Sequence, residues 1–177
     1  MKAGIVTTGS EVYHGRIKDQ FTPVVKEKLL EYGMEVPGNI LCSDDASMVE
    51  DAIREWIRKG MDLVVCTGGM SVDPDDRTPL AIRNASDEVI TYGAPVLPGA
   101  MFMLGYKKRA EGKDIPDIPV LGLPGCVMYA KRTIFDLVLP RIAAGERLSL
   151  EDFTGMGEGG LCLSCPVCTF PNCGFGK

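Results

Sequence analysis

Short apolar runs that end at glycine turns and lead into helices constrain the fold more than any other feature of the sequence. Residues 62–67 (DLVVCT) form the clearest such run, and they lead directly into Gly68-Gly69. Residues 2–8 end at Gly9, and residues 119–123 end at Pro124-Gly125, in the same way. Uninterrupted apolar runs of this length are typical of strands that are buried on both faces of a sheet.

Amphipathic patterns between these strands predict helices. Residues 18–32 carry a stripe of apolar side chains that stops at Gly33, and residues 46–59 carry another that stops at Gly60. Strands that alternate with helices predict a three-layer α/β/α sandwich with a mostly parallel sheet. Weaker patterns predict a strand at 34–41 that Pro37-Gly38 interrupts, a short helix at 78–85 and an extended segment at 88–97. A last helix is expected at about 126–144, bent or shortened by Pro140.

Length and charge exclude several classes of protein. The 177 residues suffice for one domain with a short appendage, and the net charge of -5 comes without any run of Lys or Arg. Nucleic-acid binding is therefore not expected, since it needs a basic face. The opening apolar stretch is too short for a signal peptide, and no stretch approaches a membrane span of roughly 18 residues. We therefore expect a cytoplasmic protein without a membrane segment.

Three loops that follow predicted strands, at 8–19, 67–78 and 122–127, are rich in glycine and acidic residues. In a parallel sheet, ligands bind beyond the carboxyl ends of the strands. Gly68 and Gly69 would let backbone N–H groups face an anion, and Thr67 and Ser71 add hydroxyl groups. This loop lacks the lysine of the GxxxxGK[ST] phosphate loop. The backbone of Gly125 could bind a second anion where a helix begins.

Acidic residues in these loops have two readings. Asp76 precedes a predicted helix, so it is either a helix cap or a catalytic carboxylate. Asp44 and Asp45 follow the second predicted strand, where they could hold Mg²⁺ through carboxylate oxygens or cap the next helix. The sequence contains a single histidine, His14. A metal site built from several histidines, or a Ser-His-Asp catalytic triad, is therefore not expected.

Three motifs follow predicted strands in order: Thr8-Gly9-Ser10-Glu11, then Thr67-Gly68-Gly69 with Ser71, Asp76 and Thr78-Pro79, and finally Leu123-Pro124-Gly125. Together these loops resemble the molybdopterin-binding domain of molybdopterin adenylyltransferases, molybdopterin molybdenumtransferases and competence/damage-inducible protein A-like proteins. The resemblance covers about residues 2–145. Two departures are Cys126-Val127, where the family often has Asn-Pro, and Met70-Ser71, where adenylyltransferases usually have Thr-Gly.

The resemblance implies a role in assembly of the molybdenum or tungsten cofactor, with molybdopterin as ligand or substrate. It implies Mg²⁺- and ATP-dependent transfer to molybdopterin, or insertion of metal from molybdate. Asp76, with Asp44 or Asp45, would then be catalytic. Ligand binding would fall to Gly9, Ser10, Glu11, Thr67, Gly68, Gly69, Ser71, Thr78, Pro124 and Gly125.

Two other functions are consistent with the sequence. One is a non-catalytic carrier or sensor of finished cofactor, and another is a nucleotide pyrophosphatase-like activity. A homo-oligomer, and contacts with other cofactor-assembly proteins or a molybdoenzyme, are further expectations.

A cluster of four cysteines ends the chain. Cys162, Cys165, Cys168 and Cys173 form a C-x2-C-x2-C-x4-C pattern. In a reducing cytosol such a cluster indicates metal ligands before disulfides, and the spacing favours [4Fe–4S] over Zn²⁺. The glycine-rich stretch at 154–160 (TGMGEGG) is typical of a flexible linker. We therefore expect a molybdopterin-binding domain at 1–145, followed by a linker and metal-binding tail at 146–177.

Overall fold

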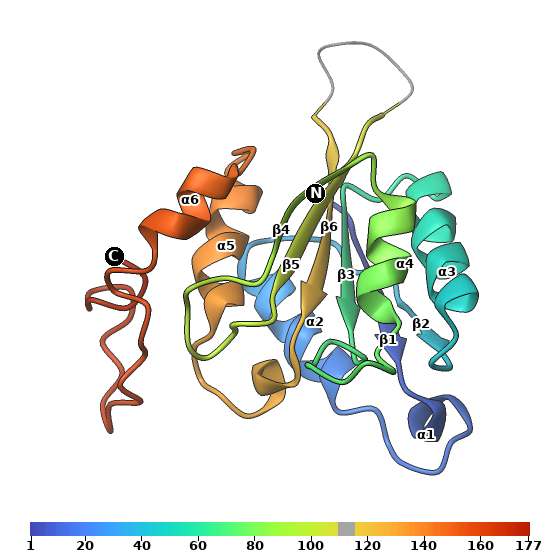
Figure 1. The fold of residues 1–177 in the computed structure, drawn as a ribbon, viewed down its shortest axis with the longest axis horizontal. Coiled ribbons are helices and arrows are strands. Elements are labelled where there is room, and N and C mark those ends of the chain that lie inside the picture. Colours follow the sequence, from blue (N-terminus) through green and yellow to red (C-terminus); the bar gives the residue numbers. More distant parts are fainter. Residues whose placement is uncertain (110–115) are drawn as a thin grey trace.

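The computed structural model describes residues 1–109 and 116–177, and it contains one six-stranded sheet in the order β2-β1-β3-β6-β5-β4 (Figure 1). Four neighbouring strands, β2, β1, β3 and β6, run parallel, and β5 is antiparallel to both of its neighbours. The strands are β1 (Ala3–Thr8), β2 (Asn39–Cys42), β3 (Leu63–Thr67), β4 (Glu88–Tyr92), β5 (Met103–Lys107) and β6 (Ile118–Leu123).

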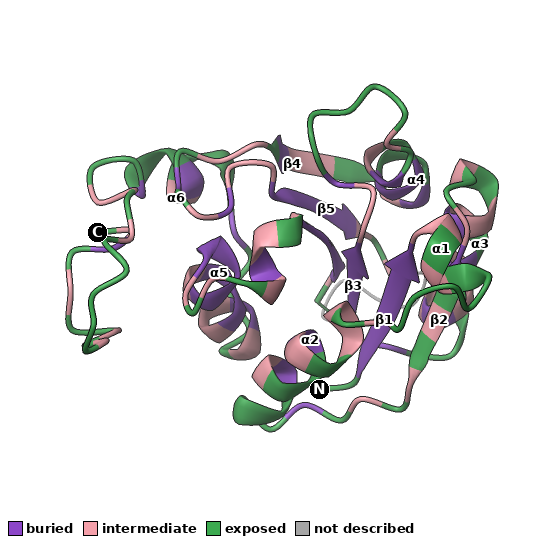
Figure 2. Ribbon diagram, turned by 90° about the horizontal axis from the view of Figure 1, so that it is seen from below, coloured by how far each residue is buried: buried purple, intermediate pink, exposed green. Residues whose placement is uncertain are grey.

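Helices cover both faces of this sheet, which confirms the predicted α/β class and mostly parallel sheet (Figure 2). One hydrophobic core joins the sheet to α2 (Phe21–Glu31) and α5 (Ile134–Ala143). The second core joins its other face to α3 (Ala46–Arg58) and α4 (Thr78–Ala85). Strands β1, β3 and β6 are buried along their whole length, as their apolar sequences predict.

Several elements differ from the prediction. The strand expected at 34–41 is confined to β2, because Pro37 cannot donate a ladder hydrogen bond. The helix expected at 126–144 is two elements: a 3₁₀ turn, η1 (Gly125–Met128), and helix α5, which begins at a capping box between Thr133 and Asp136. Strand β5 and the short helices α1 (Ser10–Tyr13) and α6 (Leu150–Gly155) had no counterpart in the prediction.

The C-terminal segment packs on the domain instead of following a flexible linker. Residues 154–160 begin inside α6, and Phe153 and Met156 are buried in the core that also contains α5. A Cβ atom at Gly160 would overlap the carbonyl oxygen of Pro95. These glycines allow close backbone packing, so their abundance does not signal a linker here. Phe175, close to the end of the chain, is 4% exposed and lies in the same core.

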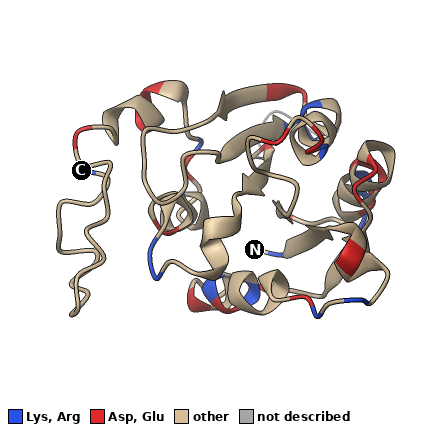
Figure 3. Cartoon of the chain, turned by 60° about the horizontal axis from the view of Figure 1, so that its bottom comes forward, with Lys and Arg blue, Asp and Glu red and all other residues tan. Residues whose placement is uncertain are grey.

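No helix among the described residues is long and apolar enough to cross a membrane. Short basic and acidic stretches are scattered along the ribbon (Figure 3), and several of their side chains form ion pairs, as in the Arg147–Glu88 and Lys107–Asp87 contacts.

Candidate functional site

The glycine-rich loops all lie at one edge of the sheet, because β2, β1, β3 and β6 are adjacent and parallel. Hydrogen bonds tie the first two loops together. The backbone N–H of Gly9 donates to the carbonyl oxygen of Cys42 at 3.1 Å, and that of Ser10 donates to Oδ2 of Asp44 at 2.9 Å. The loop after β1 is therefore held by the loop after β2, and Ser10 and Glu11 form the start of α1.

Buried threonine hydroxyls join the loops that follow β1 and β3. The hydroxyl of Thr78 donates to the carbonyl oxygen of Gly68 at 2.9 Å, and its oxygen lies 3.2 Å from that of Thr8. The Thr8 hydroxyl also reaches the carbonyl oxygen of Thr67 at 3.2 Å. Thr67 and Thr78 are 0% and 1% exposed. Their visible role is to fix the shape of the loops, and their contact with a ligand stays a prediction.

Gly68 and Gly69 adopt backbone conformations that other residues rarely take, with φ of 82° and 54°. A Cβ atom at Gly68 would overlap the carbonyl oxygen of Thr8, and one at Gly69 would lie 2.8 Å from Oγ1 of Thr78. Only glycine satisfies both conditions without a shift of the backbone. The loop therefore turns sharply over the carboxyl end of β3, in the type of backbone turn that presents successive N–H groups to an anion.

The three predicted catalytic acids have different surroundings, and Asp44 is the one that accepts from the N–H of Ser10. Asp76 is not the side-chain cap of α4; its Oδ2 accepts a 2.5 Å hydrogen bond from the backbone N–H of Ser71 and so closes the loop. Asp45 is a helix cap, because it accepts hydrogen bonds from the N–H groups of Ser47 and Met48. The pKa of Asp45 is lowered, first by the hydroxyl of Ser47.

The fourth loop leaves β6 through Pro124 and enters η1 at Gly125. Gly125 is exposed, and nothing lies within 4 Å of the position that its Cβ would take. Met70, which follows the glycine turn, is 2% exposed and packs on Gly122 of β6, where a Cβ would meet the Met70 side chain at 2.6 Å. The loops of β3 and β6 are thus packed against each other.

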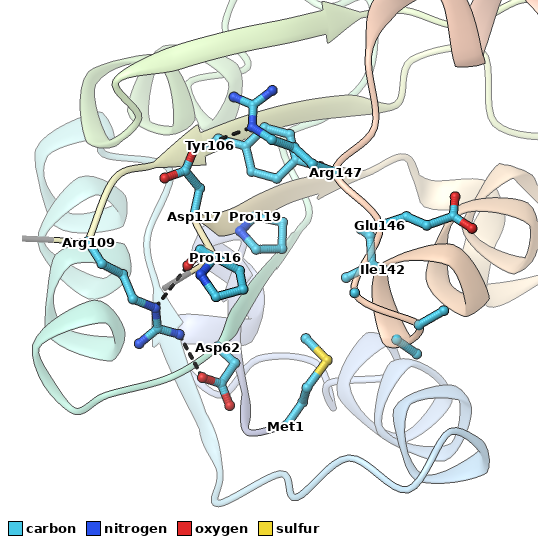
Figure 4. Close-up of a pocket in the computed structure, with 13 residues that line it drawn as sticks. Met1, Asp62, Tyr106, Arg109, Pro116, Asp117, Pro119, Ile142, Glu146 and Arg147 are labelled. Atoms are coloured by element: carbon cyan, nitrogen blue, oxygen red, sulfur yellow. Dashed lines mark hydrogen bonds and ion pairs between the residues drawn. The ribbon is translucent and has the colours of Figure 1, made fainter. Parts of the chain in front are cut away.

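A cavity of about 480 Å³ lies at the opposite edge of the sheet (Figure 4). Its walls include Met1, Asp62 and Asp117, which precede β1, β3 and β6. Both of its arginines bind carboxylates: Arg109 contacts Asp62 at 2.6 Å, and Arg147 contacts Asp117 at 3.3 Å. Its charged side chains thus hold the amino-terminal edge of the sheet together, far from the glycine loops.

The four tail cysteines line a separate cavity of about 220 Å³. Within residues 1–109 and 116–177, no three His, Cys, Asp or Glu side chains converge closely enough to hold a single metal ion. The pKa of Cys168 is lowered, first by a hydrogen bond from the backbone of Phe170 and then by the guanidinium of Arg132.

The strand cysteines behave differently from those of the tail. Burial raises the pKa of Cys42 to about 11 and also raises that of Cys66. Both are part of the core beneath α3 and α4, where a protonated thiol packs as a small apolar group.

Sequence reasoning missed Arg132 and the scaffold role of Thr8. Arg132 forms a 2.9 Å ion pair with buried Asp136, which also contacts Lys28 at 2.5 Å. The signal for Asp136 was present in the sequence as a Thr-x-x-Asp capping box, but Arg132 had no motif to mark it.

Comparison with known proteins identifies relatives of the chain. Residues 4–144 match the family model described as "Probable molybdopterin binding domain". The chain is 40% identical over 138 residues to a CinA-like protein of Mycolicibacterium vanbaalenii, a match covering 77% of this chain and 33% of the relative. It is 39% identical over 77 residues to a CinA-like protein of Mycobacterium tuberculosis, covering 44% and 18%. The chain thus spans about a third or less of the length of these curated relatives.

Solved structures share the fold. The molybdopterin biosynthesis enzyme MoaB of Thermus thermophilus superimposes with a TM-score of 0.66 at 25% identity, covering 82% of this chain and 97% of that one. The tungsten cofactor synthesizing protein MoaB of Pyrococcus furiosus gives 0.64 at 21% identity, covering 83% and 97%. CinA of Thermoplasma acidophilum, a protein of unknown function, gives 0.61 at 17% identity, covering 80% and 97%.

Proposed function

Because the chain belongs to the molybdopterin-binding domain family, we propose that it binds molybdopterin at the edge where the loops of β1, β2, β3 and β6 meet. The observation that carries the proposal is the pair Gly68-Gly69, whose left-handed turn is locked between Thr8 and Thr78. Backbone N–H groups in such a turn suit a phosphate, and the exposed Gly125 at the start of η1 offers a second group of this kind.

The proposed chemistry is Mg²⁺-dependent transfer of the adenylyl group of ATP to the pterin phosphate, whose oxygen forms a bond to the α-phosphorus while the bond to pyrophosphate breaks and pyrophosphate leaves. The donor set suits the metal, because Mg²⁺ prefers carboxylate oxygens. Asp44 and Asp76 each use Oδ2 on a loop N–H, and a carboxylate has a second oxygen with which to bind a cation. Asp45 is the weaker candidate, since its carboxylate already caps α3.

The residues of this chain would act by position and charge. Bound Mg²⁺ would neutralise phosphate charge, and transfer of this type needs little covalent chemistry from the protein. Asp44 and Asp76 would fix the metal, while the turn at Gly68-Gly69 would hold the phosphate. Ser10, Glu11 and Ser71 lie on the same loops and are proposed to contact the ligand.

Incubation of the pure protein with molybdopterin, ATP and Mg²⁺ tests this reaction, with the adenylylated pterin measured by mass spectrometry. The expected result is product that requires Mg²⁺ and is lost in Asp76→Asn. Tight binding of the pterin without product would favour the carrier or sensor function. Absence of pterin binding would contradict the proposal itself.

We also propose a cytoplasmic location, a homo-oligomer, and contacts with other assembly proteins or a molybdoenzyme. Metal insertion from molybdate is proposed as an alternative reaction. The metal centre predicted for the tail is independent of the pterin site, because the cavity that its cysteines line includes none of the glycine-loop residues.

A further inference from the structure

The cysteines of the tail line one common cavity. Cys162, Cys165, Cys168 and Cys173 all line the same cavity of about 220 Å³, although they are spread over twelve residues of chain. The rest of the wall is mainly apolar and includes Leu161, Phe170 and Phe175. Four thiols around one apolar space give a cavity that soft metals would favour, because thiolates are the ligands that they prefer.

Arg132 supplies a cation to this cavity. It lines the wall together with Cys168, and its guanidinium lies over the ring of Phe170, with the guanidinium carbon 4.8 Å from the ring centroid. Nε of Arg132 is buried, and it has no hydrogen-bond partner within the described residues. A buried N–H group without a partner is unfavourable, so a ligand that accepts its hydrogen bond would be stabilised there.

The domain holds the cavity in place. Phe175 is buried in the core with α5, and Cys162 and Cys173 pack against the same core. Backbone hydrogen bonds also fix the tail, since Leu97 donates to the carbonyl oxygen of Gly160 at 2.6 Å and Cys162 donates to that of Leu97 at 2.8 Å. Arg132 is in turn anchored by Asp136. The first and last of the four cysteines are therefore held by the packed core, and the exposed stretch at 163–167 spans between them.

We propose that Cys162, Cys165, Cys168 and Cys173 ligate one [4Fe–4S] cluster in this cavity. Each iron corner of a cubane takes one thiolate, so the four sulfurs must surround a body of several ångströms. A structural zinc ion would need all four sulfurs at about 2.3 Å from one point, usually on two separated C-x2-C pairs. The C-x2-C-x2-C run and the shared cavity agree with the cluster.

The cation beside the cavity agrees with the charge of such a centre. A [4Fe–4S] cluster with four thiolates carries a net charge of about -2 in its oxidised form, and hydrogen bonds to its sulfurs tune its reduction potential. Arg132 lines the cavity, so its guanidinium can supply positive charge there, and its buried Nε–H is without a partner among the described residues.

The test uses the full chain, produced with added iron and purified without oxygen. Iron, acid-labile sulfide and zinc are measured per chain, together with the visible absorption before and after dithionite. The expected result is about four iron and four sulfide per chain, with broad absorption that dithionite bleaches. One zinc per chain without iron would overturn the cluster, and so would the absence of both metals.

Single variants show which cysteines bind the cluster. Cys162→Ser, Cys165→Ser, Cys168→Ser and Cys173→Ser should each lower the iron content at least about twofold, since a hydroxyl is a poor ligand for soft metals. Cys126→Ser is the matched control, because Cys126 is also partly buried but lies outside the cavity. Equal iron loss in Cys126→Ser would contradict the assignment. Pterin binding should survive in Cys165→Ser, so this result is separable from failure of the proposed function.

Arg132 provides a second measurement. Arg132→Gln should move the midpoint potential of the cluster to a more negative value, because a positive charge near the cluster stabilises its reduced form. Arg132→Lys keeps the charge and should move it less. Equal potentials in the wild type and both variants would contradict a cluster beside Arg132.

Discussion

Gly68→Ala should disrupt the turn that shapes the proposed pterin site. The backbone of Gly68 has φ of 82°, and a left-handed conformation costs a non-glycine residue roughly 1–2 kcal/mol. The new Cβ would also overlap the carbonyl oxygen of Thr8, so the loops after β1 and β3 would have to move apart. Overpacking of this kind costs typically about 1–3 kcal/mol. The expected loss of unfolding free energy is therefore about 3 kcal/mol.

Gly33→Ala is the matched control. Gly33 has a similar φ of 68°, but nothing lies within 4 Å of the position that its Cβ would take. The loss of unfolding free energy in Gly33→Ala should be limited to the cost of the left-handed backbone conformation, roughly 1–2 kcal/mol. Gly33 follows α2 and lies outside the glycine loops, so this variant should bind the pterin as the wild type does.

Urea denaturation followed by circular dichroism measures both stabilities, and calorimetry measures the binding of phosphorylated pterin to each variant. For a chain of this size, a loss of about 3 kcal/mol corresponds to a fall in Tm of about 6–12 °C. Gly68→Ala should also weaken pterin binding at least about tenfold at a temperature where it is folded. Equal stabilities for Gly68→Ala and Gly33→Ala, together with unchanged pterin binding, would refute the reasoning.

Three further predictions concern single side chains. Asp76→Asn should keep the conformation of the loop, because an amide oxygen can still accept a hydrogen bond from the N–H of Ser71. The variant should nevertheless lose Mg²⁺-dependent binding of the pterin. Full retention of this binding would show that Asp76 is not part of the site. Phe175→Ala should lower the unfolding free energy by about 3–5 kcal/mol, since Phe175 is 4% exposed. The control Val167→Ala, at a 78% exposed position, should change it by less than about 0.5 kcal/mol. Equal stabilities of the two variants in urea would mean that the tail does not pack on the domain. The pKa of Asp152 is lowered to about 2, first by the N–H of Ser149 and then by Arg141. The stability that this carboxylate contributes is therefore present above about pH 4 and lost as the pH falls to about 2. Asp152→Asn should flatten the plot of unfolding free energy against pH between these values, and an unchanged slope there would contradict the assignment.

The parallel part of the fold could be predicted because its signals are local. Strands β1, β3 and β6 are apolar throughout and end at glycine turns, and α4 begins and ends at the predicted residues 78 and 85. Strand β5 escaped prediction because its pairing with β4 and β6 depends on residues distant in the sequence. Secondary structure of this kind is decided by cross-strand packing more than by the preferences of single residues.

The candidate site was predicted in outline but not in its internal contacts. The common location of the glycine loops could be predicted, since loops that follow adjacent parallel strands must meet at one edge of the sheet. The roles of Asp45 as a cap and Asp76 as a loop closure depend on which N–H groups the folded backbone brings near them. The tail was misread as lying beyond a flexible linker, because glycine serves close packing and flexibility equally well.

Hydrogen exchange of the full chain, with and without molybdopterin, tests the central claim most directly. The proposed site predicts slower exchange in the loops at 8–19, 67–78 and 122–127, which follow β1, β3 and β6. The cavity lined by Asp62, Arg109 and Arg147 should show no change, because it lies at the opposite edge of the sheet. Protection confined to that cavity, or no protection in the glycine loops at saturating pterin, would contradict the account.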